Sequence, residues 1–600
     1  MGTGAAMLEG LKREYIYIRC LARTLVRMRA VRPDGRRTIV DIVEKFAARK
    51  PANVAIFYQD RTVTYRQLDE GANRYARWAR AQGVARGEAV VLLMENRPEY
   101  LMAWLGLLKL GAVAALINTN LKGAPLAHSI AIAGARHAIL GAELGASYVE
   151  AAALIDAAPT AWASGGPVPG ARDLDGALAS VSSAPIDKSV RAGLTCKDNA
   201  FYIYTSGTTG LPKAANFSHL RMLFMMHGFG GAMNSTARDR VYCALPLYHA
   251  TGGVCAVGMA LTVGGAVIIR RKFSAREFWD DCRAFRATFF PYIGELCRYL
   301  LNAPPDPNDS RHMLRAITGN GLRPEIWPAF QKRFAIPRIV EFYGATEGNV
   351  AMLNYDGKVG AVGRVPRYMR WFMQIRLVRF DVAQESPVRG ADGFCIECDS
   401  GEVGEAAGKI TTRPGHGFEG YTRSADTQKK LLHDAFEKGD TWFRTGDLMR
   451  RDEHGYFYFV DRIGNTFRWK GENVATGEVA DAFGSVAGIK EVNVYGVVVP
   501  GADGRAGMAA LVATQGFDPA ALGEKIAAHL APFARPLFLR LRPEMEITGT
   551  FKLKKADLVK DGFDPGRIND PLYWYNQASG RYEPVTQEVY LRIVAGRIKL

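Results

Sequence analysis

The segment from Tyr204 to Lys213 constrains this chain more than any other part of its sequence. Its ten residues hold four Ser or Thr hydroxyls, two glycines and a lysine, and they follow an apolar, strand-like run at 200–204. Glycines let backbone N–H groups approach an anion, hydroxyls add donors, and lysine adds positive charge. A strand that ends in such a loop predicts a polyphosphate site, although a Ser/Thr/Gly-rich surface loop has the same composition. The segment is not a Walker A loop, because Gly-Lys-Ser/Thr is missing.

Hydrophobic periodicity predicts the fold class. A helical pattern at 68–82 is followed by a short apolar strand at 89–94, and Gly and Pro punctuate the joins. This rhythm predicts α/β layers with mainly parallel sheets. The Ala/Gly/Ser-rich stretch 150–190 is interpreted as a loop-rich insertion. We expect three parts: a basic amphipathic segment 1–38, a large domain 39–461, and a smaller unit 462–600 that begins at a Gly-containing turn.

Charge and cysteine content narrow the class of protein. The chain has 77 Lys and Arg against 60 Asp and Glu, a formal net charge of +17. Such a balance suits nucleic acid, anionic lipid or anionic substrates such as nucleotides and coenzyme A. No zinc-finger, RRM or homeodomain pattern is present, so nucleic acid ranks last. The eight cysteines are scattered, and Cys395 and Cys398 lie in a strand-like pattern, which favours a reduced, cytosolic protein.

Two segments bear on membrane contact. The uncharged run 252–269 has the length of a membrane span, but its five glycines and terminal β-branched group predict a helix followed by a buried strand. We therefore expect no transmembrane span. Residues 7–37 mix apolar side chains with seven Lys and Arg before position 33. A basic amphipathic helix of this kind can rest on anionic lipid, and an ordinary docked or frayed terminal helix fits the pattern equally well.

The decapeptide 204–213 resembles the signature loop of the acyl-adenylate-forming superfamily, which includes acyl-CoA synthetases, peptide synthetase adenylation domains and firefly luciferase. The resemblance implies an α/β fold with a large N-terminal domain of layered sheets and helices and a small mobile C-terminal α+β domain. It also implies nucleotide contacts from Tyr204, Thr205, Ser206, Gly207, Thr208, Thr209, Gly210 and Lys213, with Thr205 among the catalytic residues.

Further motifs follow in the order that the family requires. His249, in the run 245–253, matches a residue at the meeting point of acyl group and thiol. The turn 318–323 matches a loop along the adenine and contributes Gly319, Asn320 and Gly321. In the run 341–348, Tyr343 resembles the aromatic that stacks on adenine, Gly344 adjoins it, and Thr346 resembles a phosphate contact. Glu347 resembles the carboxylate that holds Mg²⁺, a hard ion that prefers oxygen ligands.

The C-terminal motifs complete the pattern. Asp447 and Arg462 match the residues that hold the ribose. The run 461–474 is similar to the fatty acid transport protein and very-long-chain acyl-CoA synthetase group, and Gly464 falls at that family's hinge. In the run 548–555 Lys552 matches the mobile catalytic lysine, with Lys554 and Lys555 as close competitors.

The resemblance implies a long-chain, including very-long-chain, fatty acid–CoA ligase that uses ATP, Mg²⁺ and coenzyme A and forms an acyl-adenylate. The alternatives are a CoA ligase for a bile, aryl or other acid, and a lipid uptake protein whose binding role dominates. The expected partners are ATP, coenzyme A and a long-chain fatty acid, without nucleic acid. We expect a cytoplasmic protein. The sequence does not decide whether it forms a homodimer or makes a peripheral contact with the inner face of the membrane.

Overall fold

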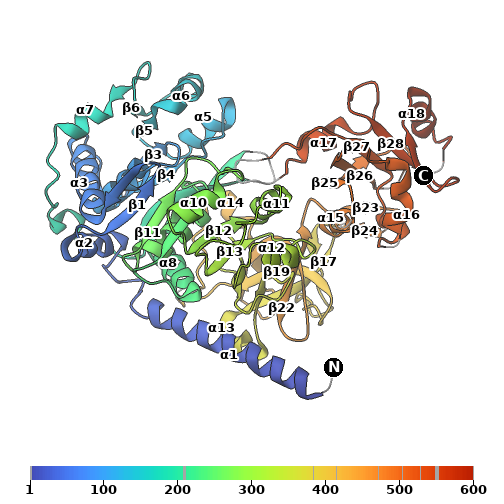
Figure 1. Cartoon of the computed structure of the whole chain (residues 1–600), viewed down its shortest axis with the longest axis horizontal. Helices are drawn as coiled ribbons and strands as arrows, with labels where there is room; N and C mark the ends of the chain where they lie inside the picture. Colours follow the sequence, from blue (N-terminus) through green and yellow to red (C-terminus); the bar gives the residue numbers. More distant parts are fainter. Residues whose placement is uncertain are drawn as a thin grey trace. The chain divides into compact units, whose positions relative to one another are not determined.

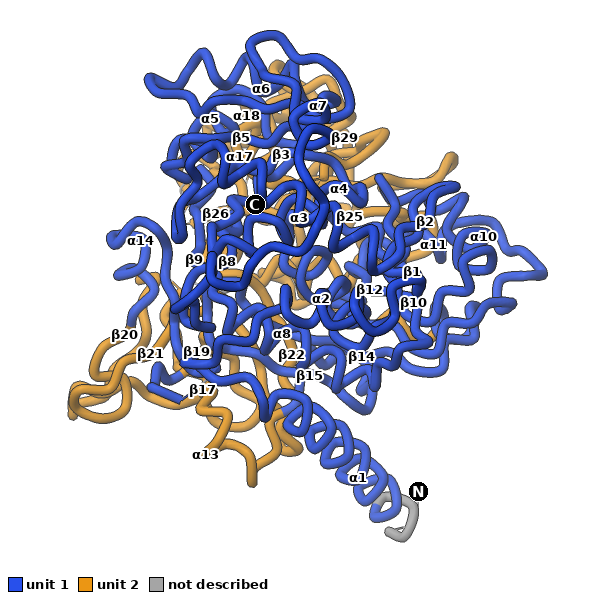
Figure 2. The backbone as a smooth tube through the Cα atoms, turned by 90° about the vertical axis from the view of Figure 1, so that its left-hand side faces the viewer, with its two compact units in different colours: residues 1–322, 329–364, 409–431 blue, residues 323–328, 365–408, 432–600 orange. Residues whose placement is uncertain are grey.

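The computed structural model describes residues 3–206, 211–382, 384–413, 415–470, 472–484, 486–502, 504–527, 529–547, 553–598 and 600. Backbone contacts divide the chain into two compact units, coloured separately in Figure 2. Unit 1 consists of residues 1–322, 329–364 and 409–431, and unit 2 of residues 323–328, 365–408 and 432–600. The domain boundaries expected from the sequence at 38 and 461 stay a prediction.

Within the described residues, unit 1 contains two large sheets (Figure 1). The first has an all-parallel centre, flanked by an antiparallel strand at each edge. Central strands of this sheet such as β11 (Ala266–Ile269) are buried on both faces, as expected for apolar runs. Its order is β2 (Arg61–Thr64), β1 (Val54–Tyr58), β11 (Ala266–Ile269), β10 (Arg240–Cys243), β12 (Phe289–Ile293), β13 (Ala316–Asn320), β14 (Ile339–Gly344) and β15 (Ala351–Asn354).

The second sheet is parallel except for its last strand, which pairs antiparallel with its neighbour. Its order is β7 (Arg172–Asp173), β6 (Thr160–Ser164), β5 (His137–Gly141), β3 (Ala89–Leu93), β4 (Val113–Leu116), β8 (Asn199–Ser206) and β9 (Pro212–Ser218). The interpretation of 150–190 as a loop-rich insertion is therefore wrong for part of this stretch. Its small residues at 160–164 form a strand because the neighbouring strands of the sheet supply hydrogen-bond partners. The local sequence pattern does not predict this pairing.

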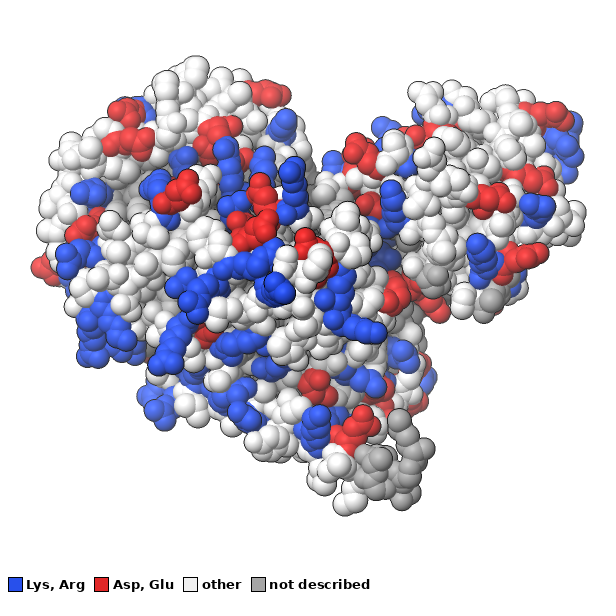
Figure 3. Space-filling view, in the orientation of Figure 1, with Lys and Arg blue, Asp and Glu red and all other residues white. Residues whose placement is uncertain are grey.

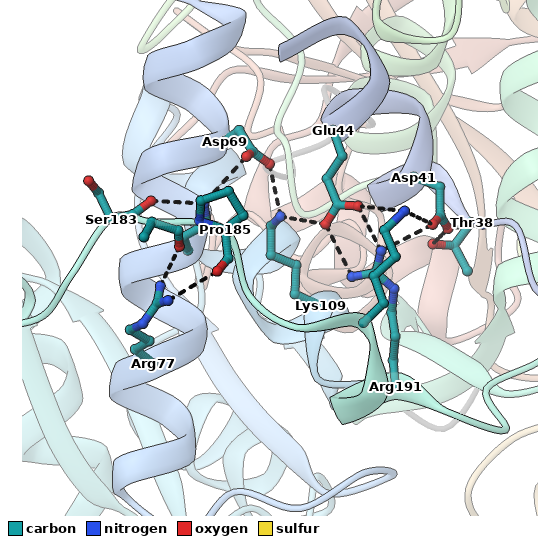
Figure 4. A network of polar contacts seen from close by, with 12 residues as sticks. Thr38, Asp41, Glu44, Asp69, Arg77, Lys109, Ser183, Pro185 and Arg191 are labelled. Atoms are coloured by element: carbon teal, nitrogen blue, oxygen red, sulfur yellow. Dashed lines mark hydrogen bonds and ion pairs between the residues drawn. The ribbon is translucent and has the colours of Figure 1, made fainter. Parts of the chain in front are cut away.

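A buried ionic network joins three helices of unit 1 (Figure 4). Lys109, at the end of α4 (Pro98–Lys109), lies 2.8 Å from Glu44 of α2 (Ile39–Arg49) and 2.8 Å from Asp69 of α3 (Tyr65–Ala81). Arg191 lies 2.7 Å from the same Glu44. Burial opposes ionisation of Glu44, but the bonds from Arg191 and Lys109 outweigh it and lower the pKa of that carboxyl. Each charge in the network therefore has an opposite partner.

The N-terminal segment forms one long helix, α1 (Thr3–Met28). Its inner face packs on α8 (His219–Met233), where Gly231 lies so close to Thr24 that a Cβ would not fit. Arg27 donates a 2.6 Å hydrogen bond to the carbonyl of Ser235. The helical prediction for residues 7–37 is confirmed as far as Met28, whereas residues 29–37 are not helical. The helix is docked rather than frayed around Thr24 and Arg27.

The run 252–269 also follows the prediction of a helix and a buried strand. A π-helical stretch (Ala250–Ala256) continues into α9 (Val257–Leu261), and β11 follows after a turn. Among the described residues, no helix combines the length and apolarity that a membrane crossing requires.

Unit 2 is built from antiparallel and mixed sheets. One runs in the order β22 (Tyr456–Arg462), β21 (Thr441–Arg451), β19 (Val403–Lys409), β17 (Ile375–Asp381) and β18 (Ser386–Pro387). A second, mixed sheet has the order β25 (Ile489–Val498), β26 (Arg505–Ala513), β27 (Phe538–Leu541), β28 (Leu572–Asn576) and β29 (Arg581–Pro584), with α15 (Thr476–Gly484) against β25. The hairpin of β23 (Phe467–Trp469) and β24 (Glu472–Val474) lies beside β26. The predicted α/β fold class is confirmed.

Candidate functional site

The two ends of the predicted phosphate loop lie on the paired strands β8 and β9. β8 and β9 pair antiparallel, with Tyr204 opposite Ala214 and Thr205 opposite Lys213. Tyr204 is buried and Thr205 is half-buried. Gly207, Thr208, Thr209, Gly210 and the side chain of Ser206 lie outside the described residues, so their predicted roles stay predictions.

A second segment, 420–427, lies against this hairpin. Asn216 donates from its backbone to Gly420, and Thr422 donates to Ala214, both at 3.0 Å. Asp426 forms a 2.8 Å ion pair with Lys213, whose ammonium group also lies 5.7 Å from the ring centre of Tyr421. The lysine predicted to meet phosphate is thus held between a carboxylate and an aromatic ring.

The predicted metal ligand Glu347 meets the same segment. Glu347 is buried, and its Oε1 accepts a 2.7 Å hydrogen bond from the hydroxyl of Tyr421. Burial, followed by the neighbouring Glu347 carboxylate, raises the pKa of Tyr421, so the phenol keeps its proton. Arg221 of α8 donates a 3.1 Å bond to the carbonyl of Thr346 and so fixes the backbone before Glu347. The hairpin, the 346–348 turn and the 420–427 segment therefore form one cluster in unit 1.

The predicted adenine loop begins at the carboxyl end of β13, whose neighbours β12 and β14 run parallel to it. Gly319 is buried against Tyr292 of the neighbouring strand, where a Cβ would collide with the Tyr292 carbonyl. Gly321 has a φ of +78°, which favours glycine, while Asn320 is exposed. Open α/β sheets bind ligands at this edge.

Glu341 fixes that loop from β14. Its side chain is fully buried and accepts three hydrogen bonds: 2.6 Å from the Tyr292 hydroxyl, 3.0 Å from the N–H of Leu322 and 3.2 Å from the N–H of Gly321. Burial raises the pKa of Glu341 to about 8, although these three bonds favour the charged form. The sequence motif 341–348 includes Glu341 but predicts no role for it, because a glutamate inside an apolar strand pattern carries no signal of its partners.

The remaining predicted residues of unit 1 lie at strand ends. Tyr343 is half-buried near the end of β14, Gly344 is the exposed last residue of that strand, and Thr346 is half-buried in the turn that follows. His249 follows β10 and caps the π-helical stretch that begins at Ala250, a type of helix found often at functional sites. The structure thus brings Lys213 and Glu347, a predicted phosphate residue and the predicted metal ligand, to the same segment, and it sets the predicted adenine residues at the edge of the first sheet.

The donor set fits Mg²⁺. No cluster of three or more His, Cys, Asp or Glu side chains occurs among the described residues. A single buried carboxylate such as Glu347, oriented by Tyr421, is what Mg²⁺ requires when substrate phosphates supply its other ligands. Thiol ligation has no support in Cys395 and Cys398, which are buried free thiols.

Within unit 2, the two residues predicted to hold ribose lie opposite each other. Asp447 on β21 and Arg462 on β22 are register partners, and Arg462 Nε lies 3.2 Å from Asp447 Oδ1. Buried Glu405 supports the turn, because it accepts from the N–H of Gly446 at 3.1 Å and from Arg444 at 2.9 Å. Gly464, the predicted hinge, follows this pair with a φ of +92°.

The lysines at 552–555 differ in their surroundings. Lys552 lies outside the described residues, and its catalytic role stays a prediction. Lys554 lies 3.4 Å from Glu546 and is half-exposed. Lys555 donates a 2.6 Å bond to the hydroxyl of Thr476, which in turn donates to Asp461 at 2.9 Å, and burial lowers the pKa of Lys555. The ammonium group of Lys555 is therefore held by a hydrogen bond near the end of β22.

Residues 43–421 match the family model of AMP-binding enzymes. Long-chain fatty acid transport protein 1 of Mus musculus is 41% identical over 599 residues, which covers 98% of this chain and 92% of that protein. Long-chain fatty acid transport protein 6 of Mus musculus is 38% identical, covering 100% of this chain and 99% of that protein.

Solved structures with the same fold are less similar in sequence. An anthranilate CoA ligase in complex with anthranoyl-AMP has a TM-score of 0.72 at 21% identity and covers 87% of this chain and 96% of its own. A Mycobacterium tuberculosis fatty acyl CoA synthetase has a TM-score of 0.61 at 24% identity and covers 87% of this chain and 98% of its own. These likenesses support the fold.

Proposed function

Since this chain belongs to the AMP-binding enzyme family and, within it, to the long-chain fatty acid transport proteins, we propose that it ligates a long-chain fatty acid to coenzyme A at the expense of ATP. The observation that carries the proposal is the cluster of Lys213, Glu347, Tyr421 and Asp426 around the β8–β9 hairpin. It joins cationic and carboxylate groups beside a loop that is rich in hydroxyls and glycine, as polyphosphate binding requires.

The reaction follows from the chemistry of a carboxylate, which is a poor acyl donor. A carboxylate oxygen of the fatty acid attacks the α-phosphorus of ATP, the bond to pyrophosphate breaks, and acyl-AMP forms. Both reactants are anions, so the site must cancel their repulsion and align them. Lys213, Thr205, Thr346 and the mobile Lys552 are proposed to supply that positive field and those donors.

Glu347 is proposed to hold Mg²⁺, which would neutralise phosphate charge when bound. Tyr421 orients the Glu347 carboxylate through its hydroxyl. Tyr343 is proposed to stack on the adenine beside the 319–321 loop, and Glu341 holds that loop in place. Asp447 and Arg462 are proposed to bind the ribose, since a carboxylate accepts from both hydroxyls.

In the second half-reaction the thiolate sulfur of coenzyme A attacks the acyl carbon, AMP leaves with the electron pair of the broken C–O bond, and the thioester forms. His249 is proposed to line the path of the acyl group and thiol. Gly464 is proposed as the hinge of a domain movement between the two steps, because glycine absorbs large changes of φ and ψ.

Acid-dependent exchange of pyrophosphate into ATP, measured over short, long and very long fatty acids, bile acids and aryl acids, tests the proposal. Long-chain acids should support exchange best, and coenzyme A should then release AMP. Exchange with an aryl or bile acid alone would contradict the proposed substrate. An uptake role remains a second candidate because the relatives are named transport proteins. A variant that keeps ligase activity but loses uptake would favour it.

A further inference from the structure

The outer face of α1 is a continuous apolar surface. Seven large apolar side chains on this helix are between 44% and 70% exposed: Met7, Leu8, Leu11, Tyr15, Ile18, Leu25 and Val26. Single exposed apolar residues are ordinary on soluble proteins, but a contiguous group marks an interaction surface. We call these seven residues the outer face of α1, and we expect this face to bind a partner.

Helical geometry separates this face from the docked one. At the α-helical period the seven residues fall within an arc of about 100°. Tyr17, Cys20 and Thr24 lie on the opposite side and are buried. Figures 1 and 2 show α1 as a straight rod at the periphery of unit 1. The buried side chains thus hold α1 on unit 1, whereas the seven side chains of the outer face do not take part in that packing.

Cations border the outer face. Lys12 and Arg19 are exposed beside it, and exposed Arg29 follows the last turn. Of the acids on α1, Glu14 is turned inward, where it pairs with Arg364, and Glu9 is exposed. Figure 3 shows Lys and Arg side chains gathered over the region where Figure 1 places α8 and α1. The occupant must therefore offer both apolar volume and negative charge.

We propose that α1 docks the protein on an anionic lipid bilayer, with the helix axis parallel to the membrane plane. Leu8, Leu11 and Ile18 would enter the boundary between headgroups and acyl chains, while Lys12 and Arg19 meet lipid phosphates. The helix lies on the bilayer rather than crossing it, because charged residues recur along its length and no described helix meets the criteria for a span.

Charge favours lipid over a second copy of the chain. Two outer faces packed together would bring Lys12 and Arg19 of one copy close to the same cations of the other, whereas phosphatidylglycerol headgroups neutralise them. A bilayer is also the phase into which a long-chain fatty acid partitions, and this one argument rests on the proposed function. The proposal of membrane docking otherwise rests on the side chains of α1.

Co-sedimentation of the full chain with vesicles tests the proposal. Vesicles of phosphatidylglycerol and phosphatidylcholine should bind the protein at least about tenfold more tightly than pure phosphatidylcholine vesicles. The triple variant Leu8→Asp, Leu11→Asp, Ile18→Asp should lose binding by about tenfold or more. Leu154→Asp is the matched control, because Leu154 is 60% exposed on unit 1 outside α1. Its binding should equal that of the wild type.

Charge-reversal variants test the role of the cations beside the outer face, and a labelled cysteine variant reports directly whether α1 enters the bilayer. Lys12→Glu with Arg19→Glu should weaken binding to anionic vesicles, while Arg276→Glu at another exposed position should not. All eight cysteines are buried, so a fluorophore attached to Ile18→Cys reads out α1 selectively. Its emission should shift to the blue with anionic vesicles, whereas a label on Leu154→Cys should not respond.

Three results would overturn the proposal. The first is a wild-type protein that stays in solution with anionic vesicles, and the second is a triple variant that binds as well as the wild type. The third is a wild-type dimer, seen by sedimentation velocity without lipid, that the triple variant abolishes, since the face would then pair with a second copy. Retained pyrophosphate exchange by the triple variant would show that it folds, and this readout does not depend on lipid binding.

Discussion

The hydroxyl of Tyr421 donates a 2.7 Å hydrogen bond to Oε1 of Glu347, a residue 74 positions away in the chain. Both side chains are buried, and the Tyr421 ring also lies beside Lys213. One tyrosine therefore orients the proposed metal ligand and lines the surroundings of the proposed phosphate-binding lysine.

Tyr421→Phe should raise the Mg²⁺ concentration needed for half-maximal pyrophosphate exchange by about tenfold, because partners of a metal ligand fix its orientation. The ring beside Lys213 is kept, so the maximal rate at saturating Mg²⁺ should fall much less. Tyr148→Phe is the control, since its buried hydroxyl donates to the Pro159 carbonyl at 2.9 Å outside this cluster. An unchanged Mg²⁺ dependence in Tyr421→Phe would show that the hydrogen bond has no role in metal binding.

Tyr292→Phe removes one of three hydrogen bonds from buried Glu341, whose other two partners are N–H groups of the 321–322 loop. The loss leaves a buried acceptor less satisfied, which typically costs about 1–3 kcal/mol. We expect a raised KM for ATP, because the loop loses its fixed position, and an unchanged KM for the fatty acid. An equal rise in both KM values would argue for general destabilisation instead.

His219 makes the stability of unit 1 depend on pH. It starts α8, is fully buried, and has no hydrogen-bond partner for either ring nitrogen among the described residues. Burial lowers its pKa from 6.5 to about 4. Between these two pH values the unfolded chain binds the additional proton, so stability is present above pH 6.5 and is lost as the pH falls towards 4.

His219→Phe should abolish this part of the acid sensitivity, which amounts to about 3 kcal/mol over that interval. Urea unfolding at pH 7 and at pH 4.5 measures it. His128→Phe, a half-buried histidine in α5 (Gly123–Ala131), is the control and should keep the wild-type difference between the two pH values. A His219→Phe variant with the same pH dependence as the wild type would exclude His219 as the cause.

Lys109→Met should destabilise the protein by about 3–5 kcal/mol, because removal of one partner strands buried charges. Glu44 and Asp69 each lie 2.8 Å from the ammonium group that the substitution removes (Figure 4). Lys45→Met, at an exposed position of the neighbouring α2, should change the unfolding free energy by less than about 0.5 kcal/mol. Adding Asp69→Leu to Lys109→Met should restore part of the loss, and an additive double variant would contradict the pairing.

The sequence motifs contain the residues that are proposed to carry chemistry, but few of the residues that hold those side chains in place. Contiguous motifs such as 204–213 and 341–348 are readable because each encodes a strand and the turn that follows it. Tyr421 and Asp426 were missed, and Glu341 was part of a recognised motif without a predicted role, because their partners come from segments that are distant in the sequence. β6 was missed for a related reason: its residues, Thr160 to Ser164, are small and weakly patterned, and become a strand only beside β5.

The three lysines near the C-terminal motif should differ in the half-reaction that each one supports. Lys552→Ala should reduce pyrophosphate exchange on the order of a hundredfold or more, because a cation at the reacting phosphate acts on the transition state. Thioester formation from supplied acyl-AMP and coenzyme A should be largely retained. Lys554→Ala is the matched control, since this half-exposed lysine pairs with Glu546 at 3.4 Å and should support both steps.

Lys555→Met should behave differently from both, because its ammonium group bonds Thr476 at the end of β22 and is buried. We expect its loss to loosen the segment around Asp461, and so to impair both half-reactions to a similar degree while lowering the melting temperature. If Lys555→Met instead removed only pyrophosphate exchange at an unchanged melting temperature, Lys555 rather than Lys552 would be the adenylation lysine.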